Sequence, residues 1–99
     1  MSLNDAVLGE DSDWSLNQNA TDATEELCTK DLPCTEAARS DQAVYTRFDS
    51  LKLAESYAKE IGADAYQSNF MVIDYSHSDI GNADRKEIEQ WIDGIHAWS

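Results

Sequence analysis

Positively charged side chains are scarce in this sequence of 99 residues, with seven Lys and Arg against twenty Asp and Glu and a net charge of −13. Such a balance repels phosphate groups, which excludes nucleic acids and anionic membrane surfaces as direct partners. Long apolar runs are also lacking, since the longest is Phe70–Ile73 and a membrane-spanning helix needs about 18 residues. We therefore expect no direct membrane insertion by this segment.

Glycine and histidine are too few for the common catalytic and cofactor-binding motifs. The four glycines form no phosphate-binding loop, and the sequence has neither a nucleophile elbow nor a pair of histidines one helical turn apart. The only cluster with chemical variety contains Asp74, His77 and Asp79, and a carboxylate near a histidine is typical of a general base or part of a metal site. The alternative is a solvated loop histidine, which we expect here, with no enzymatic activity, no bound metal and no cofactor.

Only two cysteines occur, Cys28 and Cys34, and Pro33 between them favours a turn. A disulfide here closes a loop of about seven residues and adds roughly 2.4 kcal/mol to stability on the chain-entropy formula. The alternatives are two free thiols or half of a zinc site, for which only His77 and His96 are left as further ligands. We expect the disulfide, and with it a location outside the cytoplasm.

The middle of the chain predicts a strand, a helix and a second strand. Residues 43–48 are rich in β-branched and aromatic residues whose side chains alternate between two faces, and a helical period begins at Leu51 after the capping residue Ser50. Gly62 is placed to end this helix, and a polar linker is expected after it. The four apolar residues 70–73 then predict a strand that needs cover on both faces.

Two further elements flank this unit. Residues 34–39 predict a strand that forms a hairpin with residues 43–48, although their Ala and Glu content also suits a short helix. A last helix is predicted from the capping residue Asn82, with one apolar stripe formed by Ile88, Trp91, Ile92, Ile95 and Trp98.

The expected fold is α+β in the order β-β-α-β-α, with a three-stranded, mostly antiparallel sheet and two helices on one face. The strand at 70–73 is expected beside the strand at 34–39 and parallel to the strand at 43–48. We expect residues 25–99 to form this single domain and residues 1–24 to form an acidic, largely disordered tail. The other sheet face needs cover, and the candidate contact residues are Trp14, Phe70, Val72 and Trp98.

Four stretches carry a resemblance to other proteins: Pro33–Ala37, Asp41–Ser50, Ala54–Ala58 and Asn69–Tyr75. Together they resemble uncharacterised small α+β domains of actinobacterial secreted or membrane-anchored proteins. The resemblance covers roughly residues 25–97 and implies a bacterial source and an extracytoplasmic location. It implies no activity.

The start of the chain bears on location as well. Met1–Asp5 lacks the basic and apolar regions of a signal peptide, and its first three residues are typical of a vector-derived start. We therefore expect a segment excised from a longer precursor that is secreted or membrane-anchored.

Two functional hypotheses follow. The first is a non-enzymatic extracytoplasmic domain with a structural or protein-interaction role, which contacts a protein partner or a second copy through its exposed sheet face. The alternative is an intracellular acidic module that binds a basic protein, either as an inhibitor or as a nucleic-acid mimic. The redox state of the cysteines separates the two.

Overall fold

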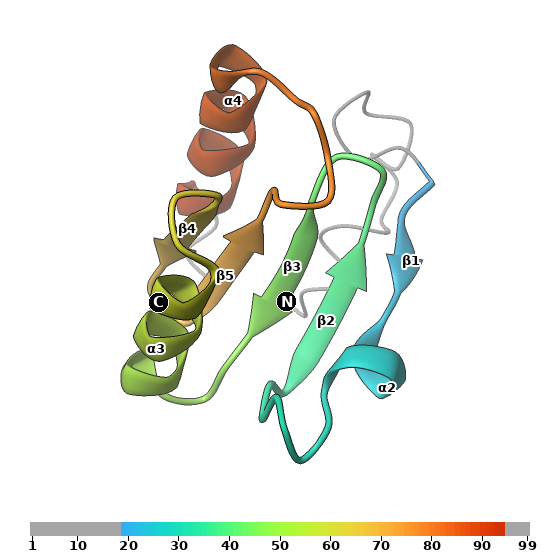
Figure 1. The fold of residues 1–99 in the computed structure, drawn as a ribbon, viewed down its shortest axis with the longest axis vertical. Coiled ribbons are helices and arrows are strands. Elements are labelled where there is room, and N and C mark those ends of the chain that lie inside the picture. Colours follow the sequence, from blue (N-terminus) through green and yellow to red (C-terminus); the bar gives the residue numbers. More distant parts are fainter. Residues whose placement is uncertain (1–18, 95–99) are drawn as a thin grey trace.

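The computed structural model describes residues 19–94, which form an α+β fold (Figure 1). Its elements in chain order are β1 (Thr21–Asp22), α2 (Thr24–Leu27), β2 (Glu36–Arg39), β3 (Val44–Arg47), α3 (Leu51–Ile61), β4 (Ala65–Ser68), β5 (Met71–Asp74) and α4 (Asn82–Asp93). The strands form one five-stranded sheet in the order β1-β2-β3-β5-β4, in which every neighbouring pair is antiparallel.

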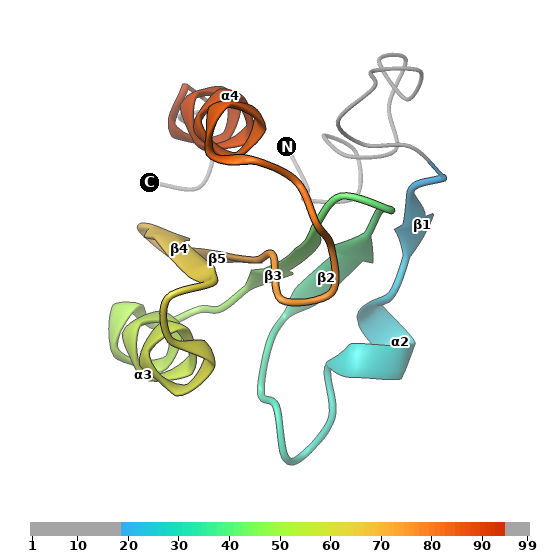
Figure 2. The same ribbon diagram turned by 45° about the horizontal axis from the view of Figure 1, so that its top comes forward.

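The sheet lies between two helical layers. Figure 2 shows α4 over one face, with α3 and the short α2 on the opposite side. Strand β5 explains this arrangement, because its side chains alternate between the faces. Met71 and Ile73 pack with Ile88 of α4, whereas Val72 packs with Ala54 of α3. All of these side chains are fully buried, and each large apolar one contributes about 1.5–3 kcal/mol to stability.

Local signals set the bounds of α3. Ser50 has an extended backbone, and its side chain accepts a hydrogen bond from the Leu53 amide at 3.4 Å, which is the N-cap that the sequence predicts. Gly62 follows the last residue with φ 92° and ψ −136°. This conformation is open almost only to glycine, so Gly62 ends the helix and turns the chain toward β4.

The predicted fold class and the hairpin of β2 and β3 are confirmed, but the three-stranded sheet is wrong because the described sheet has five strands. The predicted polar linker contains β4, which forms a second hairpin with β5. Only two residues join this pair, and Asn69 adopts φ 53° there, a conformation that asparagine tolerates.

The predicted strand order is also wrong. β5 lies between β3 and β4 and runs antiparallel to β3, rather than beside β2 and parallel to β3. The strand that runs parallel to β3 after the crossover helix is β4, with β5 inserted between them, as in a split β-α-β unit. The two long helices consequently cover opposite faces, not one face.

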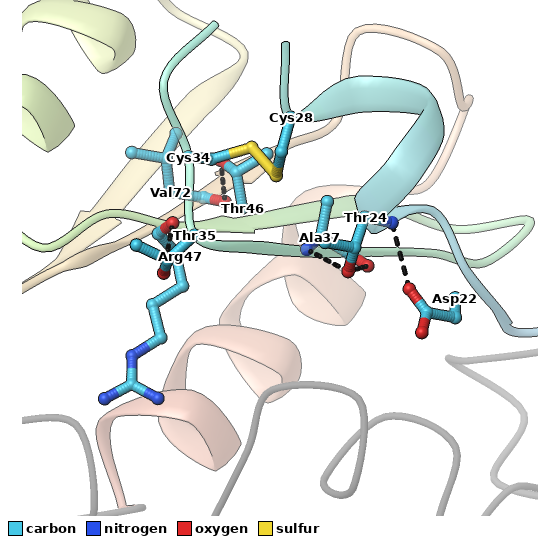
Figure 3. Close-up of a disulfide and its surroundings, with 9 residues drawn as sticks. All are labelled: Asp22, Thr24, Cys28, Cys34, Thr35, Ala37, Thr46, Arg47 and Val72. Atoms are coloured by element: carbon cyan, nitrogen blue, oxygen red, sulfur yellow. Dashed lines mark hydrogen bonds between the residues drawn. A yellow bond between two sulfur atoms is a disulfide. The ribbon is translucent and has the colours of Figure 1, made fainter.

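The fold begins before residue 25. Ala23 is buried, and its backbone amide donates to the Ala37 carbonyl at 3.0 Å. Strand β1 lies within residues 1–24, which the sequence predicts to be a tail. Thr24 extends the pairing through its hydroxyl, which accepts from the Ala37 amide and donates to the Ala37 carbonyl (Figure 3). The rest of that segment, residues 1–18, lies outside the described residues.

Helix α4 starts one residue earlier than predicted. Gly81 is its N-cap and makes no side-chain capping bond, and the predicted cap Asn82 is the first helical residue. Ile88 and Ile92 of the predicted stripe are buried, and Trp91 packs edge-on against Tyr45 with ring centroids 6.0 Å apart. The remaining stripe residues, Ile95 and Trp98, lie outside the described residues.

Candidate functional site

A disulfide joins Cys28, directly after α2, to Cys34 in the loop before β2, with their Cα atoms 4.9 Å apart (Figure 3). Of the alternatives left open by the sequence, the structure has the bonded pair. Cys34 packs on the core formed by Phe48, Ala54 and Val72. The bond therefore attaches α2 to the sheet face that α3 also covers.

A pocket of about 400 Å³ opens on this face, beside α2 and α3. Four parts of the chain build it: the end of α2, the turn between β2 and β3 with the adjoining strand ends, a single residue of α3, and the segment from the end of β5 into the following loop. Its lining residues are Leu27, Arg39, Ser40, Asp41, Gln42, Ala43, Val44, Tyr57, Asp74, His77 and Ser78.

Asp74 is the buried charge of this pocket. Its side chain is only 8% exposed, because it is the last residue of β5 and faces the α3 side of the sheet. One carboxylate oxygen, Oδ1, accepts a hydrogen bond from the Ser76 amide at 2.8 Å. The other, Oδ2, lies 3.7 Å from Nε2 of His77, whose side chain is 75% exposed. This distance is too long for a hydrogen bond.

Tyr57 forms a wall on the α3 side. Its ring packs against Phe48 with centroids 5.6 Å apart. Burial raises the pKa of the Tyr57 phenol, and the negative charges of Asp74 and, to a smaller extent, Glu60 raise it further. Tyr57 and Asp74 thus line the same pocket.

Polar contacts fix the rim. Arg39 forms an ion pair with Glu26 of α2 at 2.8 Å. The Ser78 hydroxyl donates to the Gln42 carbonyl at 2.7 Å and joins the loop after β5 to the β2–β3 turn. The Ser40 hydroxyl is within 3.3 Å of the Ala43 carbonyl. Both serine hydroxyls are thus engaged by the backbone, and neither is paired with His77 as a nucleophile would be.

The structure brings together two members of the predicted cluster and separates the third. Asp74 and His77 both line the pocket, whereas Asp79 is exposed and does not. Sequence reasoning missed Leu27, Arg39 and Tyr57, which come from distant segments. In the sequence, Tyr57 fits the helical spacing of apolar residues that begins at Leu53, and nothing in that pattern indicates that Tyr57 also lines a pocket with Asp74.

The predicted contact residues require a correction. Val72 was expected on an open sheet face, but it is fully buried between the sheet and α3. Phe70 is half-buried in the β4–β5 turn. The physical reason is that the two long helices lie on opposite faces of the sheet. Trp14 and Trp98 lie outside the described residues.

Neither a metal cluster nor a membrane span occurs within residues 19–94. No group of three or more His, Cys, Asp or Glu side chains in this part of the chain is arranged to hold a metal ion. No helix here is long and apolar enough to cross a membrane.

Comparison of the chain with protein family models, with curated proteins and with solved structures found no match.

Proposed function

We propose that this chain is a non-enzymatic, extracytoplasmic domain that binds another protein through the pocket between α2 and α3. The observation that carries this proposal is the Cys28–Cys34 disulfide, which attaches one wall of that pocket to the sheet. A disulfide persists in oxidising compartments and is rare in the cytoplasm.

The geometry of the pocket favours binding over catalysis. A general base needs to be oriented by a hydrogen bond and to lie within reach of the group that it activates. The imidazole of His77 is exposed and is 3.7 Å from the nearest Asp74 oxygen. The nearby serine hydroxyls donate to backbone carbonyls instead. The pocket instead offers a buried carboxylate and apolar walls, which suit recognition of a donor group.

The location is tested by trapping thiols in cells of the native host. An alkylating reagent is added before lysis, and the mass of the intact protein reports whether Cys28 and Cys34 carry the label. We expect both cysteines to escape alkylation until a reductant is added. Two alkylated thiols in the untreated cells would contradict the extracytoplasmic location.

The binding surface is tested by photo-crosslinking in the same cells. A benzoylphenylalanine is placed at Asp41, an exposed position on the pocket rim, and in a control at Lys86, an exposed position on α4. We expect a discrete crosslinked protein from position 41 and none from position 86. Equal yields from both positions, or no product from position 41, would overturn the proposed surface.

The net charge of −13 favours a second candidate, an intracellular acidic module that binds a basic protein. Opposite charges accelerate and select such partners. The thiol-trapping experiment separates the two candidates, because the intracellular module requires reduced cysteines in the cell.

A further inference from the structure

We propose that the pocket receives a lysine side chain of the partner protein, with its ammonium group bound to Oδ2 of Asp74. This inference rests on the proposed binding function and specifies its chemistry.

The burial of Asp74 is the first step of the argument. A carboxylate removed from water needs hydrogen bonds or an opposite charge to offset its lost hydration. Oδ1 obtains a hydrogen bond from the Ser76 amide. Oδ2 accepts no hydrogen bond from residues 19–94, and Nε2 of His77 lies 3.7 Å from it. Oδ2 is therefore the acceptor that a ligand entering the pocket would satisfy.

The geometry of the two oxygens selects lysine over arginine. A guanidinium group gains most from two parallel hydrogen bonds to both oxygens of one carboxylate. At Asp74 the Ser76 amide already takes up one lone pair of Oδ1, so Oδ2 is the more available of the two oxygens. An ammonium group is a compact charge with three donors, and it needs only one strong acceptor.

His77 supplies a second acceptor for the same group. Two atoms 3.7 Å apart both lie within hydrogen-bonding distance, about 2.8 Å, of one nitrogen placed between them. A neutral imidazole with its proton on Nδ1 accepts at Nε2. The ammonium would then bridge the two side chains that the structure leaves too far apart to bond directly.

The walls of the pocket suit the rest of a lysine side chain. Leu27, Val44 and Tyr57 present apolar surface beside Asp74, against which a four-carbon stem can pack. Arg39 is the cation among the lining residues, and Glu26 pairs with its charge at 2.8 Å. The large excess of acidic residues over the whole chain also attracts a cationic partner.

The test uses nuclear magnetic resonance of the ¹⁵N-labelled, oxidised full chain. The probes are Nα-acetyl-lysine methylamide, the arginine counterpart, and the norleucine counterpart, which keeps the stem but lacks the charge. We expect the lysine probe to shift the amide signals of Val44, Asp74 and Ser76 in a saturable manner. The arginine and norleucine probes should bind at least about tenfold more weakly. A factor of this size corresponds to the loss of roughly one charge-assisted hydrogen bond.

Two variants that each remove one negative charge show whether Asp74 itself binds the lysine probe. Asp74→Asn keeps the acceptor for the Ser76 amide but removes the charge, and should weaken the lysine probe by at least about tenfold. Asp79→Asn is the matched control, because Asp79 is exposed outside the pocket. Its affinity should stay within about twofold, since exposed charges are screened by salt.

Several results would overturn the inference. These are equal binding of lysine and norleucine probes, unchanged binding by Asp74→Asn, or an equal loss in Asp79→Asn. If Asp74→Asn fails to fold, nuclear Overhauser contacts in the wild-type protein decide instead. Protons next to the probe's ammonium should contact Val44 and Tyr57, and their absence at saturation would refute the assignment.

Failure here is distinguishable from failure of the proposed function. If a partner crosslinks at the rim but the lysine probe does not bind, the proposed binding function is supported and the lysine assignment is refuted. If the lysine probe binds but no partner crosslinks, the lysine site is supported and the proposed protein-binding surface is refuted.

Discussion

At the scale of single residues, Gly62 is the position where the backbone depends most on residue type. Its φ of 92° and ψ of −136° are unfavourable for any residue with a Cβ atom. We expect Gly62→Ala to lower the free energy of unfolding by about 1–3 kcal/mol, measured by urea denaturation. The cost is conformational, because a Cβ at this position would have no atom within 4 Å.

A loss smaller than about 0.5 kcal/mol, the size of an ordinary surface substitution, would contradict this prediction. The slope of the free energy against urea concentration should stay unchanged, since the substitution alters no buried surface. A changed slope would indicate that the end of α3 rearranges.

Tyr66 provides a second prediction at this scale. Its hydroxyl donates to Oδ2 of Asp93 at 2.5 Å. That hydrogen bond, followed by partial burial and the charges of Asp93 and Glu89, raises the pKa of Tyr66 to about 12. We expect tyrosinate absorbance of the folded protein to include a step near pH 12, which Tyr66→Phe removes. Asp93→Asn should return the step toward the ordinary tyrosine range near 10.

The stability of the fold should follow the same titration. Between pH 10 and 12 the phenol of Tyr66 keeps its proton in the folded chain but loses it in the unfolded chain, so unfolding is favoured as the pH rises. The stabilisation is complete below pH 10 and disappears as the pH rises through 12. Urea denaturation should show a smaller decline over this window for Tyr66→Phe than for the wild type. An identical decline would contradict the assignment.

Local residue signals were predictable from the sequence, whereas neighbours from distant segments were not. Ser50 and Gly62 act on the backbone beside them, and their roles follow from their own chemistry. Asp74 and His77 were predicted as a cluster because only two residues separate them. The approach of Tyr57 to Asp74 depends on how α3 lies across the sheet, and no short sequence pattern contains that information.

At the scale of elements, the disulfide holds α2 against the sheet. We expect the double variant Cys28→Ala/Cys34→Ala to lose about 2.4 kcal/mol of stability in urea denaturation, since the unfolded chain regains the entropy of a short loop. Wild-type protein with a reductant should behave in the same way. The contact of α2 with β2 through Arg39 and Glu26 is largely exposed, and such pairs contribute at most about 1 kcal/mol.

A loss below about 0.5 kcal/mol in both the variant and the reduced protein would show that α2 is held by other contacts. Affinity for the lysine probe should also fall on reduction, because Leu27 directly precedes Cys28 and lines the pocket. Unchanged affinity would mean that the pocket does not depend on the disulfide.

Strand β4 was not predicted from the sequence, for a reason that lies in its contacts with other elements. The run Phe70–Ile73 indicated a strand covered on both faces, and its last three residues are fully buried in β5. β4 has only four residues and lies at the sheet edge, and its Tyr66 and Ser68 both hydrogen-bond to Asp93 of α4. In the sequence, a short segment whose polar side chains hydrogen-bond to a distant helix cannot be distinguished from a polar linker. Because β4 was not predicted, β5 was expected to be the strand that runs parallel to β3 after the crossover helix.

At the scale of the whole molecule, charge opposes compactness. The twenty acidic residues far exceed the seven basic ones, so self-repulsion destabilises the folded chain at low ionic strength. We expect a rise from about 10 mM to 0.5 M NaCl, which shortens the screening length, to raise the melting temperature. A gain of about 1 kcal/mol corresponds to about 4–8 °C in a domain of this size.

Glu87→Lys serves as the control, because Glu87 is exposed on α4 and the swap reduces the negative charge by two units. The variant should melt higher at low salt and gain less from added salt. A melting temperature that falls with salt would show that attractive ion pairs dominate instead. Affinity for the lysine probe should respond in the opposite direction and weaken with salt.

The disulfide also sets how the chain behaves under tension. While the bond is intact, the six-residue interval from Cys28 to Cys34 spans only 4.9 Å however hard the chain is pulled. Reduced, the same interval extends to about 20 Å, at about 3.4 Å per residue. All strands from β2 to β5 and both long helices follow the bond in the chain. If such a domain is tethered at a cell surface and unfolded by pulling, its unfolded length would be greater when the disulfide is reduced. That length would therefore report the redox state of the surroundings.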